Sequence, residues 1–303
     1  MRASLPLALL AVVGCGLVLS GCGQREEPTG ALPAPFPVTV NGAGDEPTVL
    51  QAAPDRIVAL DAGAAELIDA LGAGDSLVGV PTGVRLGSGN VPTEVVGENG
   101  EIDVDAVVEL EPDLVVVTPE TDRIDAAQVA RRTGAPVYVQ PALAVDDVPR
   151  AALDLGFLLG RPVEARKLAT KIRTDVAEVK ARIAGAEPVS TFVDTGLFVT
   201  IRDPSLFADL IRQAKGEKVA PDPDAGPLTP EQLAARDPDV YLATTDSDRT
   251  LESLRASPDT RNLRAVEEGR VVVVPLDLVT RAGPRVAEAL ETIAVALHPG
   301  AFQ

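Results

Sequence analysis

The sequence has no tryptophan, only six phenylalanines and two tyrosines, and a single histidine among its 303 residues. That histidine, His298, lies in an Ala-Leu-His-Pro-Gly stretch at the end of an expected helix, which is more typical of a helix end than of a catalytic base. No Ser-His-Asp or Cys-His set for nucleophilic catalysis can be assembled without His298. A zinc site is not expected either, because imidazole and thiolate ligands are missing. The composition favours binding over catalysis, without metal or cofactor, although paired carboxylates stay open because acidic residues are abundant.

Basic residues are also scarce. The chain carries 27 lysines and arginines against 45 acidic residues, which gives a formal net charge of -18. Coulomb repulsion between such a chain and a phosphate backbone makes nucleic acid a disfavoured partner. The length is sufficient to bury a full core, in one large or two modest domains.

The first 22 residues read as a leader rather than as part of the fold. Arg2 precedes an uncharged apolar run over 5–19, which is shorter than the roughly 20 residues of a membrane-spanning helix. An export signal is therefore the better interpretation. The run ends in Leu19-Ser20-Gly21-Cys22, which resembles the lipobox of bacterial lipoproteins and implies cleavage before Cys22 and its acylation. Plain secretion, with Cys22 incidental, is the alternative.

Cysteine usage fits this reading. Cys15 lies in the segment expected to be removed, so only Cys22 remains and no disulfide is expected.

The segment 23–53 is rich in proline and shows no lasting periodicity, which predicts a flexible tether between lipid and domain. We then expect an N-terminal lobe over 54–148, connecting helices over 149–185 and a C-terminal lobe over 186–303.

A long amphipathic helix is the key element of this division. Between Pro162 and Ala184, apolar residues recur at intervals of three and four, and charged residues fill the remaining positions. Pro162 suits the first turn of a helix, and Gly185 suits its end. We interpret this helix as a strut between two lobes, with an ordinary long helix inside one domain as the alternative.

Short apolar runs alternate with helical patterns on both sides of the strut. Continuous Val and Leu runs of this kind are typical of parallel strands that are buried on both faces. The sequence predicts an α/β protein of two Rossmann-like lobes with mostly parallel sheets, joined by one long α-helix. Strands are expected at 57–60, 77–80, 114–118, 137–140, 189–194, 198–201, 240–244 and 271–275. Helices are expected at 104–110, 126–133, 205–213, 230–236, 260–268 and 284–297, with another after Asp61 and a long surface loop over 81–100.

One internal repeat links the two halves. Residues 105–118 align without gaps to residues 231–244, and each copy has an acidic residue that opens a helix, a Pro-Asp turn and an apolar strand ending in Thr. Helix capping alone explains an acidic residue at such a place. The same unit in both halves nevertheless indicates two lobes related by approximate symmetry.

In open parallel sheets, ligands bind beyond the carboxyl ends of the strands, and in two-lobed proteins they bind between the lobes. The residues expected there in the first lobe are Asp61, Ala62, Gly63, Thr82, Arg85, Thr118, Pro119 and Gln140. Those in the second lobe are Thr195, Phe198, Arg202, Thr245, Asp246, Asp277, Thr280 and Arg281. For each, a solvated loop residue is the alternative. Arg85, Arg202 and Arg281 are candidates to hold an anionic ligand by forked hydrogen bonds.

Several segments together resemble a known family. The segment Pro54-Asp55-Arg56-Ile57-Val58-Ala59-Leu60, the stretches 105–118 and 228–244, Val266-Glu267-Glu268-Gly269-Arg270-Val271 and Arg281-Ala-Gly-Pro-Arg285 resemble the substrate-binding lipoproteins of ABC importers for ferric siderophores and cobalamin. The resemblance extends from about Pro54 to Pro299. It implies two α/β lobes joined by a single long helix, with only modest closure on ligand.

The resemblance also implies a function. Such a protein, held by lipid on the outer face of the bacterial membrane, captures a small molecule between its lobes and delivers it to an importer. A ferric siderophore is the first expectation, and cobalamin or another corrinoid the second. The family docks its permease through one acidic residue on each lobe, which fall on Asp105 and Glu231 here. The alternative is an envelope lipoprotein of the same fold with a structural or sensory role.

Overall fold

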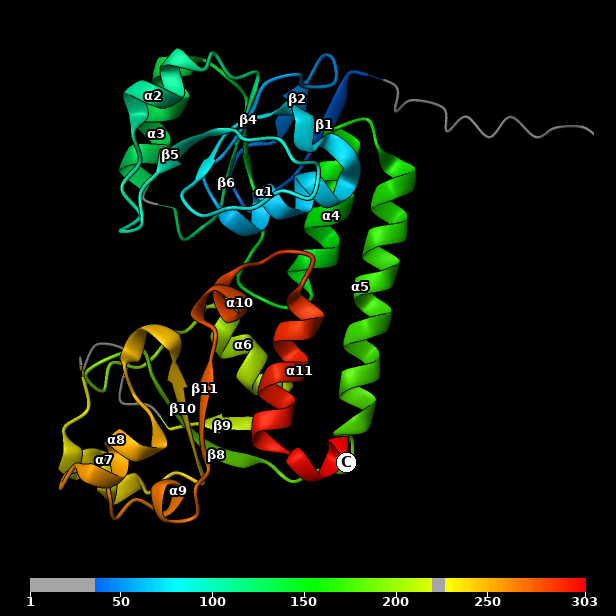
Figure 1. Ribbon diagram of the computed structural model, residues 1–303. Coiled ribbons are helices and arrows are strands. Elements are labelled where there is room, and N and C mark those ends of the chain that lie inside the picture. The colour runs from blue at the N-terminus through cyan, green and yellow to red at the C-terminus, as the bar shows by residue number, and fades with distance from the viewer. Residues whose placement is uncertain (1–35, 122, 220–226) are drawn as a thin grey trace, which may run out of the picture. The chain divides into compact units, whose positions relative to one another are not determined.

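The computed structural model describes residues 36–121, 123–219 and 227–303. Within this part, two separate parallel sheets are connected along one side by a pair of helices (Figure 1). The predicted α/β class with mostly parallel sheets is confirmed. The expected leader, Cys22 and the first part of the expected tether lie outside the described residues.

The N-terminal lobe is built on a five-stranded sheet with the order β5-β4-β3-β6-β7, in which all pairs are parallel. All four residues of β6 are buried, because hydrophobic clusters cover both faces of the sheet. The strands are β3 (Ile57–Ala59), β4 (Leu77–Pro81), β5 (Thr93–Val96), β6 (Leu114–Val117) and β7 (Val137–Val139). The helices are α1 (Ala62–Ile68), α2 (Val104–Glu109) and α3 (Arg123–Thr133), and the short turns η1 (Asp69–Ala73) and η2 (Gly74–Ser76) follow α1.

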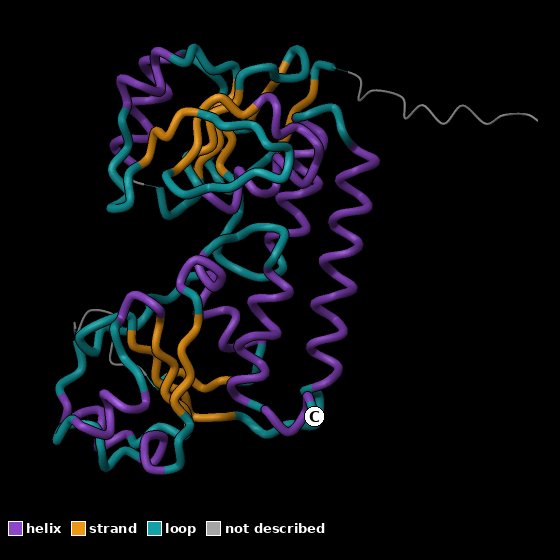
Figure 2. Tube along the Cα trace, viewed as in Figure 1, coloured by secondary structure: helices purple, strands orange, loops and turns teal. Residues whose placement is uncertain are grey.

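The C-terminal lobe has a four-stranded sheet with the order β11-β10-β8-β9, again parallel throughout. Figure 2 shows the strands of the two lobes as two distinct groups. The strands are β8 (Val189–Asp194), β9 (Gly216–Lys218), β10 (Val240–Thr244) and β11 (Val271–Val274). The helices are α6 (Leu206–Gln213), α7 (Pro230–Arg236), α8 (Leu251–Ala256), α9 (Arg264–Glu267), α10 (Leu276–Thr280) and α11 (Val286–Leu297), with the short turns η3 (Thr245–Ser247) and η4 (Pro299–Phe302).

Two antiparallel helices connect the lobes. They are α4 (Asp147–Leu158) and α5 (Pro162–Arg182), and α5 is unbroken, so the predicted strut is confirmed apart from its last two residues. The helices approach closely at Gly156, because a side-chain carbon there would overlap the Cβ atom of Ala165. The tight turn between them contains Gly160 in a left-handed conformation, φ 67°.

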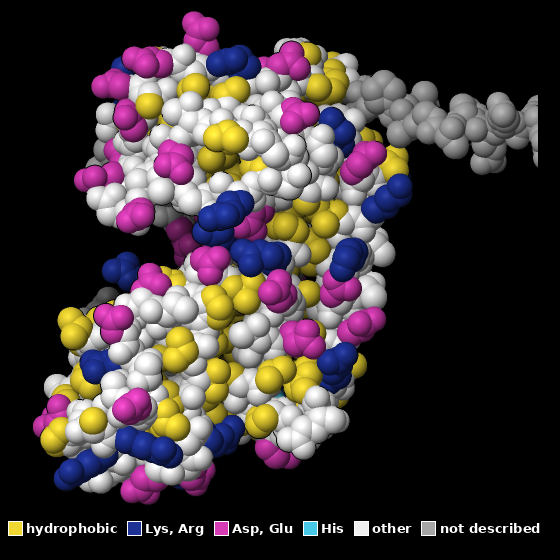
Figure 3. Space-filling view, viewed as in Figure 1, with side chains coloured by type: hydrophobic (Ala, Val, Ile, Leu, Met, Phe, Trp, Pro, Cys, Tyr) yellow, Lys and Arg dark blue, Asp and Glu magenta, His cyan; other side chains and the backbone are white. Residues whose placement is uncertain are grey.

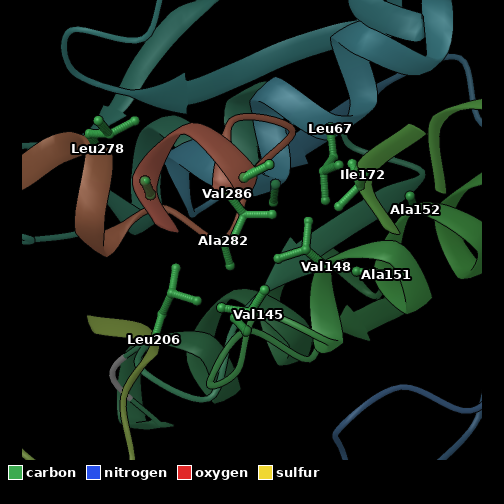
Figure 4. Packing of buried hydrophobic residues seen from close by; sticks show 14 of the residues in the cluster. Leu67, Val145, Val148, Ala151, Ala152, Ile172, Leu206, Leu278, Ala282 and Val286 are labelled. Atoms are coloured by element: carbon green, nitrogen blue, oxygen red, sulfur yellow. The ribbon is translucent and has the colours of Figure 1, made fainter. Parts of the chain in front are cut away.

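One hydrophobic cluster continues from lobe to lobe along these helices. Figure 4 shows Leu67 of α1 near Ile172 of α5, and Val145 between α4 and Leu206 of the C-terminal lobe. These side chains are almost completely buried. The connection between the lobes is therefore part of the core and not a solvated linker.

Residues 38–50 correct the expected tether. Val38–Val40 (β1) and Thr48–Leu50 (β2) form a two-stranded antiparallel hairpin, in which Val40 and Leu50 are buried. The hairpin lies against the edge strand β7, where the amide of Ala43 donates to the carbonyl of Val139 at 2.7 Å. The tether therefore cannot extend through 53 as predicted; strands of three residues are too short to give a periodic signal.

Other local predictions are also corrected. The stretch 198–201 is not a strand, because Leu197 and Phe198 have φ angles of 52° and 60°, which end the extended backbone. The helix expected at 260–268 is only the four-residue α9, and the loop expected at 81–100 contains β5. The short elements β9, α8 and α10 were not predicted.

Candidate ligand-binding cleft

The carboxyl ends of the strands in the two sheets face each other. Gln140, directly after β7, donates from Nε2 to the carbonyl oxygen of Ala282, in the loop after α10, at 3.0 Å. Gly63, at the start of α1, lies so close to Ala282 that an added Cβ would be 2.8 Å from its backbone. Beside this contact, Figure 3 shows the surface hollowed between the two lobes. The loops that follow the strands of both lobes therefore border one cleft.

An ion-pair cluster joins the lobes at the edge of this cleft. Nη1 of Arg281 lies 2.9 Å from Oε1 of Glu66 on α1, and Nη2 of Arg285 lies 3.5 Å from the same atom. Asp277 of α10 is 3.9 Å from Arg281 and 3.7 Å from Arg285. The side chain of Glu66 is 13% exposed, so water screens its pairing with Arg281 less than at the surface.

A cavity of about 430 Å³ opens at this cluster and has walls from both lobes. It brings together three of the predicted residues, Arg85, Asp277 and Arg281. Its lining consists of Glu66, Asp69, Ala70, Gly83, Arg85, Asp277, Arg281, Pro284 and Arg285. Arg85 is exposed and has no ion-pair partner among the described residues. The cavity therefore offers one uncommitted guanidinium from the N-terminal lobe beside two paired ones from the C-terminal lobe.

A second, smaller cavity of about 280 Å³ surrounds Thr118 and Pro119 at the end of β6. One wall comes from the turn of the β1–β2 hairpin, residues Ala43, Gly44 and Asp45. The amide of Thr118 donates to the hydroxyl of Thr121 at 3.0 Å, which fixes this turn. Sequence reasoning missed the contribution of the hairpin because that segment was expected to be a tether.

Asp61 has a structural role and an unusual environment. Its Oδ1 accepts the amide of Ala64 at 3.0 Å, which caps the start of α1. Burial raises the pKa of Asp61, against the lowering effect of its backbone hydrogen bonds. Desolvation also raises the pKa of Glu120, and the negative charge of Asp61 adds to this rise. Glu120 was not predicted, and nothing in its local sequence distinguishes it from other acidic residues.

A buried network lies at the corresponding edge of the C-terminal sheet. Asp194, the last residue of β8, is fully buried and accepts the hydroxyl of Tyr241 at 2.6 Å. It also accepts the amides of Gly196 and Phe198 at 2.8 and 3.0 Å. Nε of Arg249 lies 3.4 Å from its Oδ2. Desolvation, followed by the negative charge of Asp194, raises the pKa of Tyr241. An acidic residue that ends an apolar strand was the available signal for this site.

The remaining predicted residues are either packed against the core, bonded to nearby residues or exposed to solvent. Phe198 turns inward, because it packs against the core cluster around Phe192 and the guanidinium of Arg249 lies 5.0 Å from its ring. Thr195 and Thr245 make local hydrogen bonds, to the Val199 carbonyl and to the Asp246 carboxylate respectively. Arg202 is exposed, and Thr280 bonds back to the carbonyl of Leu276. In the N-terminal lobe, Thr82 bonds to Glu94, and Ala62 and Gly63 form the first turn of α1.

The two acidic residues of the repeat occupy equivalent positions on α2 and α7, which Figure 1 shows on the side of the lobes away from α5. Asp105 lies in the first turn of α2, where its Oδ1 is 2.5 Å from Nη1 of Arg132. Glu231 lies in the first turn of α7, after the capping residue Thr229. Hydrogen bonds from its own amide and from Thr229 lower the pKa of Glu231. The described part of the chain gives Glu231 no ion-pair partner.

The described ranges contain no helix with the length and apolar character of a membrane span.

Among known proteins, this chain is 27% identical over 312 residues to the uncharacterized ABC transporter substrate-binding lipoprotein YvrC of Bacillus subtilis, covering 99% of this chain and 97% of that protein. It is 29% identical over 276 residues to a cobalamin-binding protein of Halobacterium salinarum, covering 87% of this chain and 74% of that protein.

Solved structures share the fold. The periplasmic vitamin B12 binding protein BtuF of Vibrio cholerae superposes with a TM-score of 0.72 at 20% identity, covering 82% of this chain and 99% of that one. The periplasmic heme-binding protein RhuT of Roseiflexus gives 0.71 at 23% identity, covering 82% of this chain and all of that one. The family model described as periplasmic binding protein matches residues 57–278, from the first strand of the N-terminal sheet into α10. The chain therefore belongs to the periplasmic binding protein family.

Proposed function

We propose that this protein is the solute-binding component of an ABC importer and that it captures a corrinoid between its lobes. The observation that carries the proposal is the cavity lined by Arg85 from one lobe and by Asp277 and Arg281 from the other, where the strand ends of both sheets meet. A site shared between two lobes suits a protein that must release its cargo when the lobes separate. The name of the Bacillus relative, which matches over nearly its whole length, supports the role in an importer.

The choice of a corrinoid reverses the order that the resemblance alone suggested. The Halobacterium relative is named a cobalamin-binding protein and matches 87% of this chain. A corrinoid is a bulky macrocycle with many amide groups, and each amide that is buried on binding requires a hydrogen-bonding partner. The cleft fits that requirement, since its described lining is polar and the nearest predicted ring, Phe198, is turned into the core.

A ferric siderophore is the second candidate, and one observation favours it. Arg85, Arg281 and Arg285 line the same cavity, and forked guanidinium groups bind carboxylate and catecholate oxygens well. Two of these arginines are already paired with Glu66, so an anionic ligand would have to compete for them. An amide-bearing ligand has no such competition.

We further propose that acylation of Cys22 holds the protein on the outer face of the cell membrane, and that Asp105 and Glu231 dock it on arginines of the permease. The equivalent places of the two residues in α2 and α7 support this docking role. Opposite charges at both ends of an interface fix the register of docking more than they add affinity.

Calorimetric titration of the purified full chain with cyanocobalamin tests the ligand. Heme and a ferric tricatecholate siderophore serve as parallel probes. Saturable binding of cyanocobalamin in the micromolar range or tighter, with weaker or absent binding of the other two, is the expected result. Preferential binding of the siderophore would replace the corrinoid assignment, and the absence of binding to any probe would remove the proposal of a cargo of this class.

A further inference from the structure

The tight loop after β8 begins at the carboxyl end of that strand and exposes two apolar side chains, Leu197 and Val199, of which Leu197 is the more exposed. Leu197 is 77% exposed, although the next residue, Phe198, packs against the core cluster around Phe192. Isolated exposed leucines are common on protein surfaces and need no explanation by themselves. The backbone here makes this case different.

Leu197 and Phe198 both have left-handed backbone conformations, with φ angles of 52° and 60°. Residues with a side chain avoid this region because Cβ crowds the carbonyl oxygen, and two in succession are rarely found outside sites where the surroundings enforce them. The residue before them, Gly196, also has a positive φ, 130°, which glycine adopts without this cost. The strain therefore falls on two side-chain-bearing residues.

Buried Asp194 enforces this conformation. Its Oδ1 accepts the amides of Gly196 and Phe198, and the amide of Thr195 donates to the carbonyl of Val199 at 2.9 Å, which closes the loop. Asp194 is itself held by Tyr241 and Arg249. These hydrogen bonds hold the loop in a conformation in which the side chain of Leu197 points outward.

Arg249 completes the site. Its guanidinium is fixed between Asp194 and the ring of Phe198, while its terminal nitrogens donate to no partner in the described part of the chain. The hydroxyl of Thr244, at the end of the adjacent strand β10, is buried and also lacks a partner there. The guanidinium of Arg249 is thus held against the ring of Phe198, the residue that follows the exposed Leu197. A fixed guanidinium with free donors and an exposed apolar side chain in the adjoining loop suit a ligand that has carbonyl or carboxylate oxygens on the rim of an apolar surface.

We propose that Leu197 and Arg249 are further ligand-contacting residues of the C-terminal lobe, in addition to Asp277 and Arg281 of the cavity: Leu197 packs against an apolar face of the cargo, and Arg249 donates to an oxygen on its rim. This inference rests on the proposed function, because it takes the cleft as the place where cargo binds. It replaces Phe198, the residue that the sequence indicated, with its neighbour. Phe198 instead supports Arg249 from behind.

The test is Leu197→Gly in the full chain, with cyanocobalamin as the probe. Glycine removes the apolar contact and accepts the positive φ, so affinity should fall by about tenfold or more while the ligand-free protein unfolds at the same or a higher temperature. Leu197→Met, which keeps an apolar side chain, should bind within about threefold of the wild type. Val91→Ser is the matched control, because Val91 is 90% exposed and precedes β5, at the opposite edge of its sheet from the cleft.

The outcomes separate this inference from the proposed function. If the wild type binds cyanocobalamin and Leu197→Gly binds equally well, the role of Leu197 is wrong and the cargo assignment stands. A weakened Leu197→Gly with a lowered unfolding temperature would also overturn the inference, since it would mark a structural role. Failure of the wild type to bind any of the three probes would overturn both. Arg249→Lys, which keeps the charge beside Asp194 but loses the fork, should weaken binding without unfolding the protein.

Discussion

Glu66 of α1 and Arg281 of the C-terminal lobe, 215 positions apart in the sequence, form an ion pair of 2.9 Å across the two lobes. Arg285 lies 3.5 Å from the same carboxylate oxygen. These contacts join the lobes at a point distant along the chain from the connecting helices. The lobes are therefore held together by these charges at the cleft as well as by the chain through α4 and α5.

Replacing Glu66 with Gln should lower the free energy of unfolding by about 1–2 kcal/mol, because the pair is less than a quarter exposed and Arg281 would lose its main partner. Chemical denaturation measures this, and hydrogen exchange should rise in the loop 281–284. The matched control is Asp175→Asn on α5, which removes the exposed pair with Lys171 and should cost only about 0.5 kcal/mol or less. Equal effects of the two substitutions would contradict a link between the lobes.

Tyr241→Phe should destabilise the protein by about 1.5–3 kcal/mol, since it leaves buried Asp194 without its 2.6 Å hydrogen bond. Thermal or urea denaturation at neutral pH gives the value. Tyr138→Phe is the control, because Tyr138 donates at 3.1 Å to Asp154, which is partly exposed and has Arg150 nearby. The loss should be smaller there. A larger loss at Tyr138 would show that the Asp194 network carries less stability than its burial indicates.

Asp61→Asn should raise the free energy of unfolding at pH 7. The folded protein raises the pKa of Asp61, so the folded state binds this proton more tightly than the unfolded state, and ionisation at higher pH costs stability. Asparagine removes that cost and still caps α1, because its side-chain oxygen can accept the amide of Ala64. The gain should shrink as pH falls through the raised pKa of Asp61 in the folded state, and it should be absent below the unfolded pKa of about 3.9, where Asp61 is protonated in both states. Denaturation midpoints across this pH range measure it. A gain that does not depend on pH would contradict the assignment.

Alanine at Asp105 or Glu231 should reduce stimulation of the importer's ATPase while ligand affinity stays unchanged, because both residues lie on α2 and α7, away from the cleft cavities. Glu231→Ala should have the larger effect, since Asp105 already pairs with Arg132 at 2.5 Å and must break that contact to dock. ATPase rates with the reconstituted importer give the comparison. Full stimulation by the double variant would withdraw the docking roles.

Cys22→Ser should move the protein from the membrane to the soluble fraction, because a chain without acyl groups has no strong hold on a bilayer. Fractionation of cells that express each form, followed by immunoblotting, measures the distribution. Cys15→Ser should leave the distribution unchanged, as Cys15 lies in the segment expected to be removed. Retention of Cys22→Ser in the membrane would contradict the proposed anchor.

The parts of the fold that sequence predicted well are those with many residues in a regular pattern. The spacing over 162–184 predicted α5 because a helix of 21 residues repeats its apolar face several times. The Val and Leu runs at β6 and β10 were clear since both faces of these strands are buried. The hairpin β1–β2 and strand β9 have three residues each, too few for periodicity to appear.

The site was only partly accessible from the sequence. Strand ends indicated Arg85, Asp277 and Arg281, and the structure brings these three to one cavity, because the carboxyl ends of parallel strands meet at one edge. Their role in ligand binding stays a prediction. Phe198 was expected in the cleft as an aromatic ring, but its left-handed backbone turns it inward and exposes Leu197 instead. The partners of Glu66 depend on how the lobes face each other, which no local pattern encodes.

The absence of a side chain at Gly63 affects how closely the two lobes can approach each other. At Gly63 the backbone of α1 packs directly against the backbone of Ala282, so the two lobes are in contact at that point. A larger residue at position 63 would force the two lobes further apart at this contact. The width of the cleft in the ligand-free protein thus depends on a glycine at the contact between the lobes, next to the proposed binding site.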